Sequence, residues 1–342
     1  MAKSVTMQNV ADDARVSIAT VSRIVNNPES VRESTRRKVL RSMNELGFIQ
    51  SVPRAADTES LTILIVIQTL SNQFDTDLAA SIMNTAYIHG YNSMIVVNNN
   101  KNYTTFEAFE NIFRDVAIAG IILETGLIDP DLVSALQSHY PVVMASDYIE
   151  SLDISYVSID DAAAARTAAS YLISTGHTKI ALINCDPDYH LTKYREKGFA
   201  QALTEAGIEI NKNWVLRLST VNYFMVHSYI RQLLEQKERP DAIFACSDMY
   251  GMAAINAAQQ LGIRVPEELS VIGFDNTSIA SMTNPSLTTV AQPITQIGAQ
   301  SCELLIQKIR NRNCANQHIV LDTELIIRNS TCPKNMGVSG HM

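Results

Sequence analysis

The sequence is poor in the features that indicate export, membrane insertion or a disulfide framework. It has five cysteines among 342 residues, an odd number, and none of them forms a C-x-x-C pair. No apolar region follows the first residue in the manner of an export signal, and no apolar run approaches the ~18 residues of a membrane-spanning helix. We therefore expect reduced thiols, no export signal, no membrane span and a cytoplasmic location.

Motifs of catalysis and metal binding are missing as well. The seven histidines form no H-x-x-x-H pair and no Cys/His cluster with the spacing of metal ligands. Neither the nucleophile motif G-x-S-x-G nor the phosphate loop G-x-x-x-x-G-K-[ST] occurs. We expect no enzyme activity, no cofactor and no metal site, and we expect His177, within TGHTK, to lie in a surface loop.

Charge is divided unevenly along the chain. The formal net charge is −8, yet residues 1–54 contain nine Lys and Arg against five acidic residues and so carry +4, while the rest carries −12. A chain of this length is also too long for a single hydrophobic core, which suggests two or three domains. A basic head on an acidic body indicates a regulator whose small domain contacts nucleic-acid phosphates.

The basic segment has the pattern of a helix-turn-helix. Residues 6–27 read TMQNVADDARVSIATVSRIVNN, and their apolar positions form two short helical faces separated by residues 15–17. Ser17 is placed to cap the second helix. With a third helix expected at about 32–46, residues 1–49 are predicted to form a DNA-binding headpiece.

The outward face of the second helix predicts DNA contacts, because it has small, hydroxylic and basic side chains where a solvated face would be richer in Glu and Lys. We expect Arg23 to read a base, with Ile18 and Ala19 as apolar or close-approach contacts. Alternatively, Ile18 packs internally and Arg23 binds only phosphate. Phosphate contacts are expected from Thr6, Ser17, Thr20, Ser22 and Asn26, and from Arg32 and Arg36 unless these two are only solvated helix charge.

After a polar linker at 50–60, strands and helices alternate. Short apolar runs predict strands at 61–67, 93–97, 119–124, 141–145, 156–159, 179–184, 241–246 and 269–274. Helical patterns lie between most of them, at 76–89, 105–116, 130–139, 162–174, 195–206, 225–236 and 249–261. Strands that are apolar on both faces indicate buried parallel sheets, and this number of strands suits two doubly wound lobes with a ligand site between them at the strand ends.

Several motifs, in order, resemble the LacI/GalR family of transcription repressors. They are VADDARVSIATVSRIVNNPESVRESTRRKV, LGF, ISTGHTKIALI, YREKGFAQALTEAGI, FACSDMYGMAA, LGIRVPEELSVIGFDN and PSLTTVAQP. The resemblance covers roughly residues 6–332. It implies an all-α helix-turn-helix headpiece and an α/β periplasmic-binding-protein-like core of two doubly wound parallel-sheet lobes.

The resemblance also implies domain bounds and partners. One lobe would comprise 61–160 and 292–322 and the other 161–291 and 323–332, with crossovers near 160–162, 291–293 and 321–323 and a disordered tail at 333–342. The family pattern is a homodimer on double-stranded operator DNA whose affinity changes when a small-molecule effector binds between the lobes. An activator protein at the promoter is a candidate further partner.

The hinge departs from the family pattern. Residues 51–57 read SVPRAAD, which places Asp57 where members usually have a leucine that wedges into the minor groove. A carboxylate cannot act as an apolar wedge and is repelled by phosphate. We expect a hinge that does not kink DNA by intercalation and that couples core and headpiece loosely.

The family's ligand positions match Arg195 of YREKGF and Asp275 of GFDN, which would hold ribose or hexose hydroxyls by charge-assisted hydrogen bonds. Alternatively, Arg195 pairs with a nearby acid and Asp275 caps the next helix. Phe74 matches an aromatic that stacks on a base or sugar, although the family's Asn-Pro-aromatic-aromatic reads NQFD here.

Weaker pocket candidates are Asp147, Asp160, Leu191, Val221 and Ser247. Asp160 ends a strand, and it or Asp161 can equally cap the following helix. Helix capping is the favoured interpretation for Ser247 and its neighbour Asp248.

The effector class depends on a narrower resemblance. Residues 191–199, 285–293 and 322–331 are most similar to a nucleoside-responsive member of the family, which implies a nucleoside such as cytidine. A sugar is the alternative effector. A solute-binding protein of a transporter is the alternative of another class, but it should carry an export signal and lack a basic headpiece.

Overall fold

A computed structural model describes residues 7–26, 31, 35, 36, 38, 39, 42, 61–98, 103–113, 116–124, 128–218 and 222–334, with the backbone alone for 22, 23, 25 and 26. The chain divides into two compact units, Met1–Asp57 and Thr58–Met342. The predictions for Thr6, Arg32, Val221 and the hinge at 51–57 lie outside the described residues.

The smaller unit is helical where it is described. Helix α1 (Met7–Ala14) and helix α2 (Ile18–Asn26) are joined by residues 15–17, which confirms the predicted helix-turn-helix. Further along, Thr35, Arg36, Lys38, Val39 and Ser42 are also helical. The core of this unit consists of Val10, Ala11, Ala14, Val21, Ile24 and Val39.

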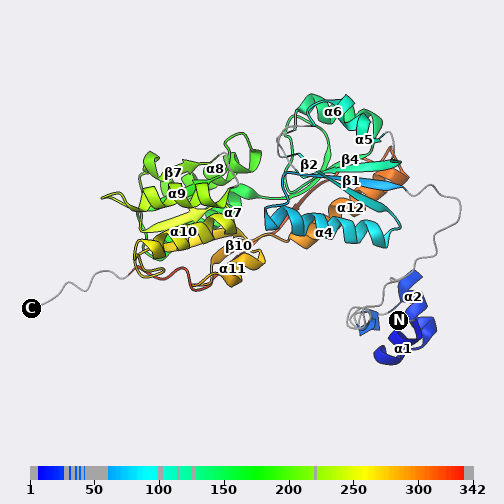
Figure 1. The fold of residues 1–342 in the computed structure, drawn as a ribbon, viewed down its shortest axis with the longest axis horizontal. Helices are drawn as coiled ribbons and strands as arrows, with labels where there is room; N and C mark the ends of the chain where they lie inside the picture. Colours follow the sequence, from blue (N-terminus) through cyan, green and yellow to red (C-terminus); the bar gives the residue numbers. More distant parts are fainter. Residues whose placement is uncertain are drawn as a thin grey trace, which may run out of the picture. The chain divides into compact units, whose positions relative to one another are not determined.

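The larger unit contains two six-stranded sheets (Figure 1). The first, which we call the N-lobe sheet, has the order β11-β5-β4-β3-β1-β2, with all neighbouring strands parallel. Its strands are β1 (Thr62–Ile67), β2 (Asn92–Val97), β3 (Ile118–Leu123), β4 (Val142–Ala145), β5 (Ser155–Ile159) and β11 (His318–Leu321). One face packs on α4 (Gln73–Ile88) and α12 (Ile294–Arg310), and the other on α5 (Phe106–Phe113) and α6 (Pro130–His139).

The second sheet, the C-lobe sheet, has the order β12-β10-β9-β8-β6-β7. Its strands are β6 (Ile180–Asn184), β7 (Val215–Arg217), β8 (Ala242–Ala245), β9 (Ser270–Asp275), β10 (Thr288–Ala291) and β12 (Glu324–Ile326). Its helices are α7 (Asp161–Ser174), α8 (His190–Glu205), η2 (Lys212–Trp214), α9 (Tyr223–Leu234), α10 (Asp248–Gln260) and α11 (Ser278–Met282). Strand β12 runs antiparallel to β10, which corrects the expectation of purely parallel sheets.

The predicted fold class is confirmed, and every predicted strand occurs with its ends within one residue of the expected position. The elements that were not predicted are β7, β10, β11, β12, η2, α11 and α12. The four strands have only three or four residues, too few for a distinct apolar run. Helix α12 is different, because it is long and its buried Ile294, Ile297, Leu304 and Leu305 have helical spacing. This pattern was present in the sequence and was overlooked.

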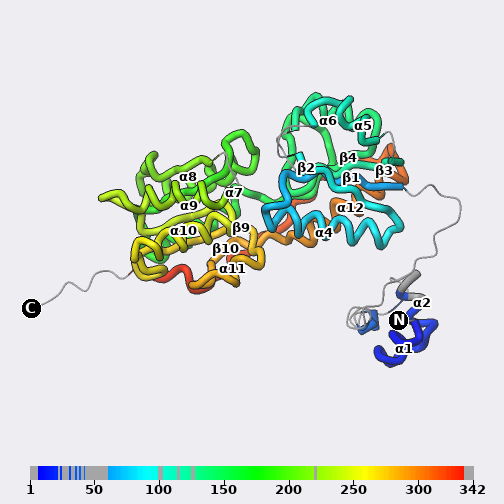
Figure 2. The backbone as a smooth tube through the Cα atoms, in the orientation of Figure 1, coloured from blue at the N-terminus to red at the C-terminus, as the bar shows by residue number. Residues whose placement is uncertain are grey.

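The chain passes between the two sheets three times (Figure 2). Asp160 links β5 to α7, residues 292–293 link β10 to α12, and residues 322–323 link β11 to β12. Each lobe is therefore built from segments that are distant in the sequence. Within the described part of the chain, no helix is long and apolar enough to cross a membrane.

Candidate functional site

The centre of the candidate site is Arg195, a residue of α8 that is 5% exposed. Its Nε donates to Oδ1 of Asp161 at 2.7 Å, and its Nη1 donates to the carbonyl of Cys246 at 2.6 Å. Its guanidinium carbon lies 3.7 Å from the centre of the Phe274 ring. These contacts agree with the alternative interpretation, in which Arg195 pairs with a nearby acid. Neither of the two hydrogen bonds uses Nη2.

Asp275 lies next to this cation. It is the last residue of β9 and has φ +107°, a backbone conformation that residues other than glycine rarely adopt. Nε2 of Gln292 donates to its Oδ1 at 2.8 Å. Burial raises the pKa of Asp275 well above its usual range, and the Arg195 guanidinium opposes that rise. The suggestion that Asp275 caps a helix is wrong, because Thr277 occupies the position before α11.

The N-lobe sheet contributes three buried carboxyls at the ends of its strands. Asp75 lies in the first turn of α4, Glu124 directly follows β3, and Asp147 follows β4. Nδ2 of Asn72 donates to Asp75 at 3.0 Å, and the backbone N–H of Gln68 donates to Glu124 at 2.9 Å. Burial raises the pKa of Asp75 to about 7. Burial, and then the charge of Asp75, raise the pKa of Glu124 well above its usual range.

Side chains of the two lobes meet near these carboxyls. Nε2 of Gln68, after β1, donates to the hydroxyl of Tyr189, before α8. The side chains of Gln73 and Ser278 form hydrogen bonds with each other at 2.7 and 3.0 Å. These hydrogen bonds join the lobes through neutral side chains, with no ion pair between them.

A second set of contacts between the lobes centres on His190, in the first turn of α8. Its Nδ1 lies 3.3 Å from Oδ1 of Asp147, and its Nε2 lies 3.5 Å from Oε1 of Glu150. Burial acts to lower the pKa of His190, but Asp147 and Glu150 outweigh burial and raise the pKa. The hydroxyl of Tyr194 also donates to Glu150. Helix α8 therefore contacts the loop after β4 through two of its side chains, His190 and Tyr194.

Several of the predicted effector contacts have structural roles in this structure. Phe74 is 5% exposed and belongs to the apolar core, so its ring does not form an open wall. Asp160 is exposed and caps α7 by accepting from the backbone N–H of Ala163 at 2.9 Å. Ser247 caps α10, as the favoured interpretation holds. Leu191 is half-buried at the start of α8.

Besides the role of Asp161 as a buried partner rather than a cap, the sequence interpretation missed the site residues Gln68, Asp75, Glu124, Tyr189, His190 and Gln292. Glu124 is the last residue of a predicted strand, and Asp161 comes two residues after another. Because parallel strands of one sheet end at the same edge, this position is itself a signal for a ligand site. Gln292 lies in a crossover next to a strand that was not predicted.

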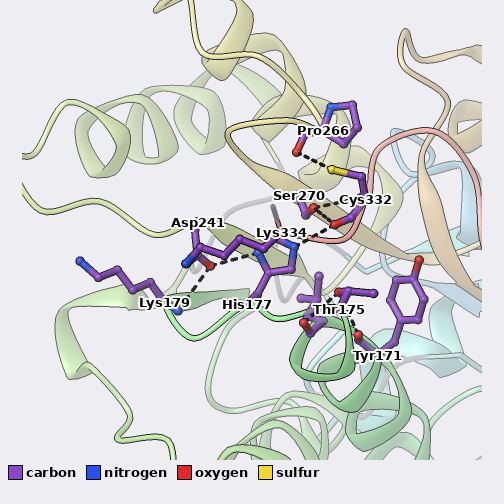
Figure 3. A network of polar contacts seen from close by, with 10 residues as sticks. Tyr171, Thr175, His177, Lys179, Asp241, Pro266, Ser270, Cys332 and Lys334 are labelled. Atoms are coloured by element: carbon purple, nitrogen blue, oxygen red, sulfur yellow. Dashed lines mark hydrogen bonds and ion pairs between the residues drawn. The ribbon is translucent and has the colours of Figure 1, made fainter. Parts of the chain in front are cut away.

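His177 lies in the loop between α7 and β6, but it is 3% exposed, so the expected surface position is wrong. Figure 3 shows its polar contacts. Its Nδ1 lies 3.2 Å from Oδ1 of Asp241, and its Nε2 lies 3.2 Å from the carbonyl oxygen of Cys332. Lys334 joins the same network, because its Nζ donates to Asp241 at 2.5 Å and its backbone N–H donates to the Thr175 carbonyl at 2.8 Å. The prediction of a disordered tail from residue 333 is therefore wrong at Lys334.

On the headpiece, the first residues of α2 are open to a partner. Ile18 is 48% exposed, so the alternative that it packs internally is wrong, and Ala19 is exposed beside it. The hydroxyl of Ser17 accepts from the backbone N–H of Thr20 at 3.1 Å, as a cap does. Arg36 is half-buried. Ser22, Arg23 and Asn26 lie in α2, but their side chains are outside the described part.

A helix-turn-helix together with a two-lobed core that gathers a buried cation and carboxyls at its strand ends defines a DNA-binding regulator with a ligand-binding core. Comparison with known proteins identifies the family. Residues 6–51 match "Bacterial regulatory proteins, lacI family", and residues 169–331 match "Periplasmic binding protein-like domain". The chain belongs to the LacI family, and it is a DNA-binding transcriptional repressor with a ligand-binding domain.

Relatives match the chain over nearly its whole length. It is 38% identical over 338 residues to the HTH-type transcriptional regulator DegA of Bacillus subtilis (strain 168), covering 96% of this chain and 99% of that protein. It is 33% identical over 329 residues to the HTH-type transcriptional repressor CytR of Escherichia coli (strain K12), covering 95% and 96%. The solved structure "transcriptional regulator CelR-cellobiose complex" superimposes with a TM-score of 0.70 at 27% identity, covering 95% and 99%. These relatives are regulators rather than enzymes.

Proposed function

We propose that the chain is a cytoplasmic, homodimeric repressor whose affinity for double-stranded operator DNA changes when a polyhydroxylated small molecule binds between the lobes. The observation that carries the proposal is the buried Arg195 between Asp161, Phe274 and Asp275. A cation fixed by protein contacts, with one nitrogen that these contacts do not use, is prepared to donate to a ligand.

The carboxyls around this cation suit hydroxyl groups. A neutral carboxyl both donates and accepts a hydrogen bond, whereas a carboxylate only accepts. Burial raises the pKa of Asp75, Glu124 and Asp275, so their neutral forms persist at higher pH than usual. A sugar hydroxyl, which also donates and accepts, can be satisfied by such groups in either direction.

Two effector classes meet these requirements, and each has separate support. A nucleoside such as cytidine is supported by the similarity to CytR. A sugar is supported by the burial of Phe74 in the apolar core. The family pattern would provide an exposed aromatic ring for a nucleoside base to stack on, and a buried ring offers no such face.

The proposed coupling acts through the contacts between the lobes. An effector held by Arg195 in one lobe and by Asp75 or Glu124 in the other would favour one arrangement of the lobes, and that arrangement would change how a dimer presents its two headpieces. The dimer is supported by exposed apolar side chains on α4, α9 and α11, namely Met83, Ile88, Phe224, Tyr229 and Met282. The only support for an activator partner is that the hinge sequence departs from the family pattern.

A thermal-shift screen of nucleosides and sugars tests the proposal. We expect a compound of one class to raise the melting temperature of the core in the wild type and to raise it far less in Arg195→Lys and Arg195→Ala. Arg166→Ala, which removes one partner of an exposed ion pair, should keep the full shift. Equal shifts in the wild type and both Arg195 variants would contradict the site, and no shift with either class would contradict the effector assignment.

A further inference from the structure

Two cysteines that are 61 positions apart in the sequence come together beside the candidate effector site. The Sγ atoms of Cys185 and Cys246 are 2.8 Å apart. Cys185 directly follows β6 and Cys246 directly follows β8, and these two strands are parallel neighbours in the C-lobe sheet. The backbone N–H of Cys246 donates to the carbonyl of Ile183 at 2.8 Å, so strand pairing itself fixes the approach.

The surroundings give the two thiols different roles. Cys185 is partly exposed, whereas Cys246 is fully buried. The Cys185 sulfur also has a hydrogen bond with the hydroxyl of Tyr250. The hydrogen bond from Cys246, together with the nearby Arg195 charge, lowers the pKa of Cys185, although burial opposes this. Burial raises the pKa of Cys246 well above its usual range. Since thiolates are the reactive form, Cys185 is the nucleophile and Cys246 the partner within reach.

We propose that Cys185 and Cys246 form a peroxide-reactive thiol pair that closes to a disulfide. The Cys185 thiolate attacks a hydroperoxide, the O–O bond breaks, hydroxide or alkoxide leaves, and Cys185 becomes a sulfenic acid. The Cys246 sulfur then attacks the Cys185 sulfur, the S–O bond breaks, and water leaves with the Cys246 proton. Two thiols are oxidised by two electrons, and one hydroperoxide is reduced.

The position of the pair gives its oxidation a consequence for the effector site. The carbonyl of Cys246 accepts the hydrogen bond from Nη1 of Arg195 at 2.6 Å. A disulfide shortens the distance between the sulfurs to about 2.0 Å, so the residue that anchors Arg195 must adjust. This consequence rests on the proposed function, whereas the oxidation chemistry does not.

The test treats the purified full-length chain with hydrogen peroxide, alkylates the remaining thiols and maps the peptides without reduction. We expect a Cys185–Cys246 cross-linked peptide within single chains, a higher melting temperature of the core, and reversal of both by dithiothreitol. Cys185→Ser should abolish the cross-link. Cys246→Ser should leave Cys185 as a sulfenic acid that dimedone traps, and Cys314→Ser, which changes a partly exposed thiol elsewhere, should keep the cross-link.

Three results would overturn the proposal. Cys185 could stay fully alkylatable after peroxide treatment, oxidation could fall on Cys314 or Cys332 first, or Cys185 could cross-link only between chains. None of these results depends on which effector the protein binds, so failure of this proposal is distinguishable from failure of the proposed function.

Discussion

Arg195 and Asp161 form an ion pair inside the core, with Nε and Oδ1 2.7 Å apart and each side chain 6% exposed. The pair joins α8 to the first residue of α7, directly after the chain has crossed from the N-lobe sheet. Burial raises the pKa of the Asp161 carboxyl, and the Arg195 guanidinium acts in the opposite direction. The same cation therefore stabilises a crossover and faces the candidate effector site.

Asp161→Asn should strongly destabilise the core, because it leaves the Arg195 charge buried without its counter-charge. Breaking a buried pair in this way costs about 3–5 kcal/mol. Urea unfolding can be followed by the fluorescence of Trp214, the single tryptophan, which is buried in the C lobe. Glu205→Gln, which breaks the exposed pair with Arg166, is the control and should unfold like the wild type. Equal midpoints for the two variants would contradict the assigned role of the pair.

Asp75→Asn should flatten the dependence of stability on pH. The pKa of Asp75 rises from 3.8 to about 7 on burial, so the folded state binds the proton more tightly than the unfolded chain. The contribution of this group to stability is complete below pH 3.8 and is lost as the pH rises through about 7. Between pH 5 and pH 8, wild-type stability should therefore fall more than that of the variant.

The measurement is the urea midpoint of the core at several pH values across that interval. Asp77→Asn is the matched control, since Asp77 lies on the same helix and is exposed. Parallel curves for the wild type and Asp75→Asn would show that Asp75 ionises normally in the folded protein.

Gly198→Ala should destabilise the contact between α7 and α8. A Cβ at Gly198 would lie 2.0 Å from the carbonyl oxygen of Ala162, which is backbone and cannot rotate away. Overpacking of this kind costs about 1–3 kcal/mol or more, and separation of the helices would also move Arg195. Thermal unfolding of the variant should show the loss, while Lys193→Ala, an exposed change on α8, should not. A wild-type melting temperature for Gly198→Ala would refute the close approach.

Two arginines of the headpiece should affect DNA binding in different ways. On an operator selected from a random library, Arg23→Ala should cost about 1–3 kcal/mol and relax the preference at one base pair, as loss of a base contact does. Arg36→Ala should weaken all sequences alike and reduce the steep salt dependence of binding by about one unit of slope, as loss of a phosphate contact does. Titrations at several salt concentrations distinguish these outcomes. A flat salt profile for the wild type would count against phosphate binding by the headpiece.

Local pattern predicted much of the fold, and particular elements show its limits. The apolar run LTILIVI marks β1 because a buried parallel strand needs apolar side chains on both faces. Strand β10 reads TTVA, and its buried Thr288 and Thr289 hydroxyls bond to Thr331 and Asp248, respectively. Those partners lie about 40 residues away, at separations of 43 and 41. A strand whose polar side chains are satisfied by distant partners has no local signature.

The candidate site was predicted in the same uneven way. Asp275 ends β9, Asp147 follows β4, and Arg195 contacts the carbonyl of Cys246 directly after β8. Phe74 belongs to the core, and Asp160 caps a helix. Adjacent residues such as Asp160 and Asp161 look alike in the sequence, yet only one of them meets Arg195. The difference depends on how α7 is rotated against α8, which a single sequence does not express.

The sequence by itself determined the helix-turn-helix, the two-lobed α/β class and the positions of the longer strands, because helical and strand periodicity are properties of neighbouring residues. Only the tertiary structure decided that Cys185 meets Cys246, that His177 is buried against Asp241, and that Arg195 is held by Asp161. Each of these contacts joins residues between 34 and 64 positions apart. Their chemistry arises from strand order and helix packing, which are set by burial of the whole core rather than by local pattern.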